Sequence, residues 1–129
     1  MSTKKQINCQ QAPSPAGPYS QGIIGGPFVF VAGQRPVDPA TGNIGKDIGE
    51  QTAYCLKNIE AILREAGSSL KDVVKTNVFL SDLADFDAMN EVYREMMPAP
   101  YPARTTVGTV LRGILIEIEA VAMLNQEEE

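Results

Sequence analysis

Residues 47–80 decide the fold class and read DIGEQTAYCLKNIEAILREAGSSLKDVVKTNVFL. Asp47 and Glu50 have the spacing of a capping box, and Gly67 is a residue type that commonly follows the end of a helix. A mostly apolar stripe at steps of three and four between them predicts one helix, formed by Ile48, Thr52, Leu56, Ile59, Leu63 and Ala66. Residues 73–80 are rich in β-branched side chains and predict a strand soon after that helix.

Strand and helix patterns extend from this segment toward both ends of the chain. On the N-terminal side, residues 20–24 and 28–33 predict a hairpin across the turn Gly25-Gly26-Pro27, and a less regular strand lies near 5–9. On the C-terminal side the sequence predicts a helix over about 85–97, strands around 104–107 and 115–123, and a solvated acidic tail at 125–129. The order β-β-β-α-β-α-β-β predicts one α+β domain over residues 1–129, with two helices on one face of a mixed sheet.

The other face of this sheet needs cover that the chain does not supply. We expect Val29, Val31, Ile116 and Ile118 to place apolar groups there, without a third layer to bury them. Association of copies through the sheet is the simplest solution.

Composition and charge exclude several classes of function. The chain has 129 residues, with 16 acidic and 11 basic side chains and a net charge of −5, and its basic residues are scattered, which argues against nucleic-acid binding. Histidine is absent, which removes the commonest metal ligand and the commonest general base near neutral pH.

Cys9 and Cys55 match no zinc spacing, and a disulfide between them stays open as an alternative to free thiols. With no signal pattern in residues 1–11 and no apolar run of about 18 residues, we expect a cytoplasmic protein that does not enter the membrane.

One arginine and two glutamates near the C-terminus are the leading candidates for chemistry. Arg104 lies in YPARTTVG (101–108), and its planar fork suits a carboxylate, while Glu117 and Glu119 interrupt the apolar strand ILIEIEAVA (114–122). The combination suggests a pocket for a small carboxylic acid with a carboxylate to handle protons. The alternatives are a structural ion pair between Arg104 and one of these glutamates, and a solvated or interface strand.

Three further polar residues have ordinary interpretations. Tyr19, in a Pro- and Gly-rich loop, is by default a packed aromatic with a wet hydroxyl, and Asn90 is most simply an exposed polar residue of the second helix. Strand alternation places Thr106 on the same face as Arg104, but the chain has no histidine to activate its hydroxyl.

Several short segments in this order resemble the Rid family, the reactive intermediate deaminases once called YjgF-type proteins. They are AGPYSQG (16–22), VAGQ (31–34) with Pro36, VKTNVFL (74–80) with Asp82-Leu83, NEVY (90–93), Pro102-Ala103-Arg104 and IEIEA (116–120). The resemblance implies a chorismate-mutase-like α+β domain that forms a homotrimer with a central β-barrel, outer helices and a cleft at each subunit interface. It also implies hydrolysis of enamines and imines such as 2-aminoacrylate and 2-iminobutyrate to 2-keto acids and ammonia, with no cofactor or metal.

The resemblance assigns roles to individual residues. Arg104 would hold the substrate carboxylate, Glu119 would position and activate water, and Tyr19 would close the cleft and hydrogen-bond substrate or water. Gly33 would offer backbone at the pocket wall, and Asn90 would be a lesser contributor.

The backbone N–H of Thr106 would contact the polar end of the ligand. The best-studied branch often carries Ser-Cys after the arginine and Ser before Gly-Gln, whereas this chain has Thr105-Thr106 and Ala32. A backbone role at Thr106 is compatible with such a replacement, and a thiol role is not.

Three competing interpretations remain open. One is a regulatory trimer that binds small acids without catalysis. The second is an endoribonuclease or translation inhibitor, against which the acidic balance and missing histidine weigh. The third is a chaperone-like surface activity, and no residue in the sequence distinguishes it from the other interpretations.

Overall fold

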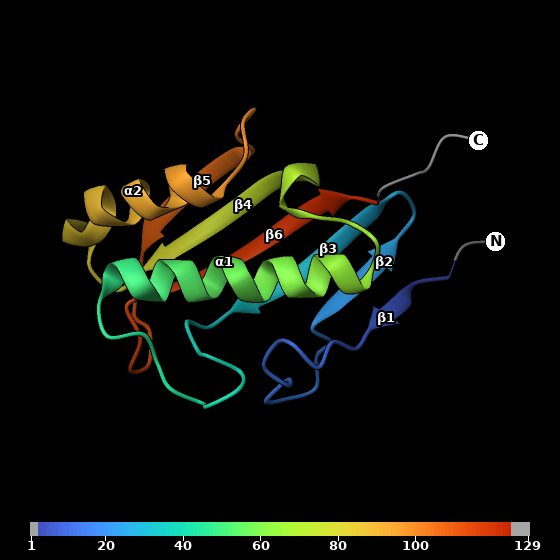
Figure 1. The fold of residues 1–129 in the computed structure, drawn as a ribbon, viewed down its shortest axis with the longest axis horizontal. Helices are drawn as coiled ribbons and strands as arrows, with labels where there is room; N and C mark the ends of the chain where they lie inside the picture. The colour runs from blue at the N-terminus through green and yellow to red at the C-terminus, as the bar shows by residue number, and fades with distance from the viewer. Residues whose placement is uncertain (1–2, 125–129) are drawn as a thin grey trace.

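The computed structural model describes residues 3–124, so the acidic tail at 125–129 lies outside the described residues. Figure 1 shows a twisted sheet with both helices on one side of it. The elements are, in order, β1 (Lys5–Ile7), β2 (Gly22–Gly25), β3 (Phe28–Gln34), α1 (Ile48–Glu65), η1 (Leu70–Asp72), β4 (Val73–Leu80), η2 (Leu83–Asp85), α2 (Phe86–Met96), β5 (Ala103–Gly108) and β6 (Ile116–Met123). No helix among these is both long and apolar enough to cross a membrane.

The six strands form one mixed sheet in the order β1-β2-β3-β6-β4-β5. β4 and β5 run parallel, and every other neighbouring pair is antiparallel. The predicted α+β class and order of elements are therefore confirmed. The second helix begins at Phe86, because residues 83–85 form a separate 3₁₀ turn capped by the Asp82 carboxylate, which accepts from the Ala84 N–H.

Both ends of α1 follow from local chemistry. At its N-terminus, Asp47 Oδ1 accepts from the Glu50 N–H at 2.9 Å, but Glu50 Oε1 accepts from the N–H of Lys46 (2.8 Å). In the expected capping box Glu50 would accept from the N–H of Asp47, so one of its two hydrogen bonds is formed and the other goes to the preceding residue, Lys46. At the C-terminus, Gly67 has a φ of +84°, and the N–H groups of Gly67 and Ser68 bond the carbonyls of Arg64 and Leu63 in a Schellman motif.

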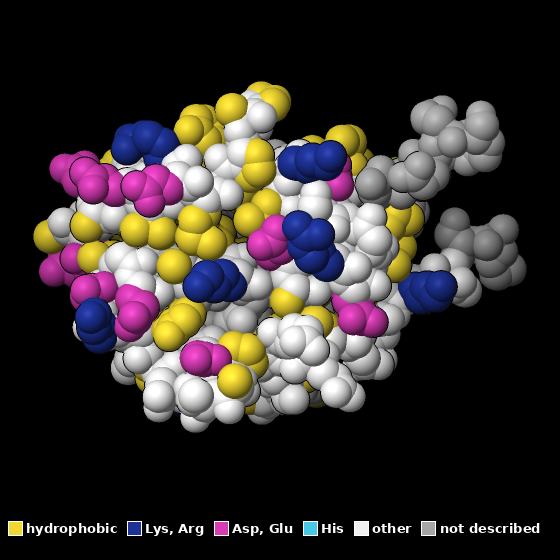
Figure 2. Space-filling model, in the orientation of Figure 1, with side chains coloured by type: hydrophobic (Ala, Val, Ile, Leu, Met, Phe, Trp, Pro, Cys, Tyr) yellow, Lys and Arg dark blue, Asp and Glu magenta, His cyan; other side chains and the backbone are white. Residues whose placement is uncertain are grey.

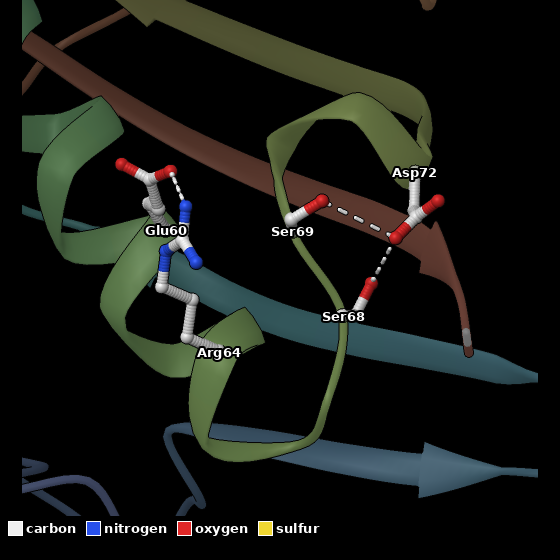
Figure 3. A network of polar contacts seen from close by, with 5 residues as sticks. All are labelled: Glu60, Arg64, Ser68, Ser69 and Asp72. Atoms are coloured by element: carbon white, nitrogen blue, oxygen red, sulfur yellow. Dashed lines mark hydrogen bonds and ion pairs between the residues drawn. The ribbon is translucent and has the colours of Figure 1, made fainter. Parts of the chain in front are cut away.

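Polar contacts fasten the end of α1 to the sheet. In the turn after the helix, Ser69 Oγ donates to Asp72 Oδ2 at 3.3 Å, as Figure 3 shows. Ser68 Oγ donates to the Met123 carbonyl of β6 at 2.8 Å. The nearby Arg64–Glu60 ion pair lies on the exposed side of α1, where such pairs contribute little.

The face of the sheet that carries the core differs from the prediction. Val29, Val31, Ile116 and Ile118 do not lie on the open face, because alternate residues of β3 and β6 point toward the helices and these four are buried beneath them. The helices complete this core with apolar residues that are fully buried, namely Leu56, Ile59, Ile62, Leu63 and Met89.

The open face nevertheless carries apolar groups. Phe28, Phe30 and Met123 point away from the helices with 38%, 46% and 48% of their surface exposed. An uncovered apolar face is therefore present, but it is built from the opposite set of strand residues.

Candidate functional site

Arg104 lies on the helix-covered side of β5, the last strand of the sheet order. It pairs with Thr76 of β4 and is half-buried. A pocket of about 400 Å³ opens beside it and is lined by Asn90, Tyr93, Arg94, Tyr101, Pro102 and Arg104. Asn90 is half-buried in this pocket, so its interpretation as a simply exposed residue is wrong.

Two aromatic rings of α2 lie against the guanidinium of Arg104. Its Cζ atom is 4.8 Å from the centroid of the Tyr93 ring and 5.6 Å from that of Phe86. Among residues 3–124 the one ion pair is Arg64–Glu60, so the alternative of a structural salt bridge from Arg104 to Glu117 or Glu119 is wrong within the chain. The guanidinium is held by rings, without a carboxylate partner in the described part of the chain.

Glu119 lies on the open side of the sheet, in β6. It pairs with Asn77 of β4, whose Nδ2 donates to Glu119 Oε2 at 2.8 Å. Both side chains line a cavity of about 490 Å³ together with Tyr19 and Lys75. The Tyr19 side chain is 52% exposed, and its hydroxyl accepts from the Ala16 N–H at 3.1 Å.

Arg104 and Glu119 therefore occupy opposite faces of the sheet in one chain. Their pairing partners Thr76 and Asn77 are consecutive in β4, and consecutive strand residues point to opposite faces. A single chain does not bring the guanidinium and the carboxylate into one pocket. A site that uses both needs one residue from each of two copies.

Gly33 lies beneath the carboxylate of Glu117, where the pairing of β3 with β6 is irregular between Val31 and Gln34. A Cβ atom at this position would overlap Glu117 Oε2 and approach Glu117 Cδ to 3.1 Å. The close approach favours glycine, because a larger residue would displace the Glu117 carboxylate; with Tyr19, Gly33 lines a smaller pocket of about 100 Å³.

We expect Gly33→Ala to lower the free energy of unfolding by about 1 kcal/mol, at the low end of the cost of overpacking, because the flexible end of the Glu117 side chain can move aside. In a Glu117→Ala background the same substitution should cost much less, because the overlapping atoms are gone. Denaturant unfolding at fixed protein concentration measures both costs. Gly49→Ala is the control, since a Cβ there meets no atom closer than 3.6 Å. Equal costs in both backgrounds would show that Glu117 is not the obstacle.

Thr106 contributes a buried hydroxyl two residues beyond Arg104 on the same face. Its Oγ1 atom is shielded from solvent and has no hydrogen-bond partner among the described residues. The two cysteines are also buried, and both are free thiols, so the disulfide alternative is wrong. Burial raises the pKa of the Cys55 thiol far above its usual range, which makes this thiol a packing group.

The six predicted residues thus fall into separate groups. Arg104 and Asn90 share one pocket, Glu119 and Tyr19 share another, Gly33 and Tyr19 share a third, and Thr106 lines none of these three. The helix predicted over about 85–97 contains Phe86 and Tyr93, but neither residue was predicted to belong to the site, and Asn77 was not either. The local signal for Asn77 was its place at the end of a polar run, Lys75-Thr76-Asn77, inside the strand 73–80.

The family comparison fits this architecture. Residues 9–124 match the family model described as Endoribonuclease L-PSP. The chain belongs to the Rid (YjgF/RutC) family. A RutC family protein of Pyrococcus abyssi is 54% identical over 122 residues, which cover 92% of this chain and 96% of that relative.

Two further Rid relatives carry informative names. TdcF of Escherichia coli, named as a candidate reactive intermediate deaminase, is 42% identical over 93% of this chain and 97% of its own length. The crystal structure of TdcF with bound serine has a TM-score of 0.88 and covers 92% of this chain and 98% of that one. A Schizosaccharomyces pombe relative named mmf1, mitochondrial, is 45% identical over 95% of this chain and 78% of its own length.

Proposed function

We propose that this Rid protein hydrolyses reactive 2-imino and 2-enamino acids, such as 2-iminobutyrate and 2-aminoacrylate, to 2-keto acids and ammonia. The observation that carries the proposal is Arg104, a half-buried cation in a pocket, held by two rings and without a carboxylate partner among residues 3–124. A guanidinium in this state suits a bidentate carboxylate ligand. Support also comes from TdcF, whose name describes a deaminase and whose crystal structure holds serine, an α-amino acid.

In this mechanism the substrate binds as its imine tautomer with its carboxylate on Arg104. Asn77 occupies Oε2 of Glu119, which leaves Oε1 to accept a proton from water as the water oxygen attacks the imine carbon. The proton then passes to the substrate nitrogen, which completes the carbinolamine. Glu119 next takes the proton of the carbinolamine hydroxyl as the C=O bond forms and delivers it to the nitrogen as the C–N bond breaks, so that ammonia and the 2-keto acid leave. General acid–base catalysis of this kind supplies about 10²–10⁴-fold. Tyr19 closes the cleft over the substrate, and Gly33, Asn90 and the Thr106 N–H complete its wall.

The site is completed by a second copy of the chain, in a homotrimer with an active site at each interface. This part of the proposal rests on the opposite faces of Arg104 and Glu119 and on the exposed Phe28, Phe30 and Met123 of the open face. Burying these side chains against another copy would favour association by the hydrophobic effect.

A coupled assay tests the activity. A pyridoxal-phosphate threonine dehydratase generates 2-iminobutyrate in the presence of semicarbazide, which traps the imine. We expect this protein to lower semicarbazone formation in proportion to its concentration, because hydrolysis competes with trapping. The matched control is an equal amount of the Glu119→Gln variant, which keeps the shape of the side chain but lacks the base.

An unchanged rate of semicarbazone formation, combined with measurable binding of 2-ketobutyrate, would favour the non-catalytic binding protein instead. The ribonuclease suggested by the description of the family model has little support here, because the chain has a net charge of −5 and no histidine. In Figure 2 the Lys and Arg side chains of the helix-bearing face lie scattered among acidic ones.

A further inference from the structure

The contacts of Arg104 form a short chain across three elements. The guanidinium of β5 lies against the ring of Tyr93 in α2, at 4.8 Å from Cζ to the ring centroid. Tyr93 Oη in turn lies 2.7 Å from Oγ1 of Thr76 in β4, the residue that pairs with Arg104 in the sheet. The strand neighbour of the arginine thus fixes the ring on which the arginine rests.

Burial makes this arrangement rigid. Thr76 is fully buried and Tyr93 is 4% exposed, so their hydrogen bond is shielded from water. Breaking it would leave two buried hydroxyls without a partner, which is costly. Phe86, Asn90 and Tyr93 follow one another at steps of four and three, so one face of α2 is directed at the arginine.

The phenol of Tyr93 does not act as a counter-ion. Burial raises its pKa, against opposing effects of the Thr76 hydrogen bond and the Arg104 charge, so the ring is neutral near pH 7. A neutral ring attracts a cation through its face. A cation–π contact uses none of the guanidinium N–H donors in a conventional hydrogen bond, so these donors remain available for a ligand.

We infer that Tyr93, anchored by Thr76 and assisted by Phe86, is a positioning residue that orients the Arg104 guanidinium before a carboxylate binds. The inference deepens the proposed function, on which it rests for its kinetic consequence. Without the ring, Arg104 would sample several rotamers, and each binding event would have to order a flexible side chain. The expected signature is weaker carboxylate binding with little change in the chemical step.

The decisive comparison is between two variants of Tyr93. Tyr93→Leu removes the ring and keeps an apolar side chain, and we expect it to raise KM for the imine and Kd for 2-ketobutyrate about tenfold, with kcat within about twofold of wild type. The Tyr93→Phe/Thr76→Val double variant keeps the ring and removes both hydroxyls together. Because the buried ring stays in place but loses its anchoring hydrogen bond, KM and Kd should rise by no more than about threefold, clearly less than in Tyr93→Leu.

Two further measurements separate positioning from general damage. The NMR signals of the Arg104 side chain, assigned through Arg104→Lys, should show a ring-current shift that Tyr93→Leu strongly reduces and the double variant keeps; the remainder in Tyr93→Leu comes from Phe86. Phe86→Leu, at a position that is 37% exposed, should produce a smaller shift change and serves if Tyr93→Leu does not fold. The matched control is Tyr54→Leu on α1. The Tyr54 ring has a cation of its own, with Lys57 Nζ 6.0 Å from the ring centroid, and it lines neither candidate pocket. This substitution should leave the Arg104 signals, KM and Kd unchanged.

Unchanged Arg104 signals and an unchanged Kd in folded Tyr93→Leu would overturn the inference. Equal losses of binding in Tyr93→Leu and in the double variant would also overturn it, because the ring would then be irrelevant. Ring-dependent signals and binding in a protein without turnover would support the positioning role while refuting the deaminase.

Discussion

Arg104→Ala should reduce kcat/KM for 2-iminobutyrate by about 10²–10⁴-fold, because it removes two charge-assisted hydrogen bonds worth about 1.5–3 kcal/mol each. The loss should appear in the semicarbazide assay as a rate indistinguishable from that without enzyme. Stability should change little, since Arg104 makes no ion pair within the described residues.

Arg104→Lys should also be poor, because a point charge cannot reproduce the planar fork or its contact with Tyr93. Arg64→Ala is the matched control. It removes an arginine from an exposed pair with Glu60 that lines neither the Arg104 pocket nor the Glu119 pocket, and it should keep full activity. Activity retained in both the alanine and the lysine variants of residue 104 would rule out the carboxylate clamp.

Mixing two inactive variants should restore activity. Arg104→Ala and Glu119→Gln each lack half of the site, and in oligomers assembled at random from equal amounts about one site in four receives an intact Arg104 and an intact Glu119 from different copies. We therefore expect about a quarter of wild-type specific activity after the two chains are co-refolded, and almost none from either chain alone.

The matched control is the Arg104→Ala/Glu119→Gln double variant mixed equally with wild type. A shared site again leaves about a quarter of the sites intact, whereas a site within one chain would leave about half. No recovery in the first mixture, together with half activity in the second, would show that both residues act in the same chain. Subunit exchange is verified by co-purification of differently tagged chains.

Local signals predicted the elements of this protein well. The cap at Asp47 and the glycine at 67 delimit α1, and the β-branched run at 73–80 coincides with β4. Strand alternation also holds as expected: Arg104 and Thr106 share one face of β5, and Glu117 and Glu119 share the face of β6 opposite Ile116 and Ile118. These features depend only on residues close in sequence.

The features that position the site depend on strand order and were not predictable in this way. The alternation of side chains along a strand does not indicate which face of the sheet the helices cover. Val29 and Ile116 were therefore predicted on the open face, whereas they are buried beneath the helices. The insertion of β6 between β3 and β4 pairs Asn77 with Glu119, and no local pattern indicates that pairing. The placement of Arg104 and Glu119 on opposite faces also depends on this strand order, because it follows from their pairing with the consecutive residues Thr76 and Asn77.

The placement of Arg104 and Glu119 on opposite faces has a genetic consequence under the shared-site proposal. Each chain would serve two different sites, giving its arginine to one neighbour and its carboxylate to another. An allele that damages both residues would then disable more sites than its share of the chains, and would be partly dominant in a cell that also makes the intact protein. Two alleles that each damage one residue would instead complement each other.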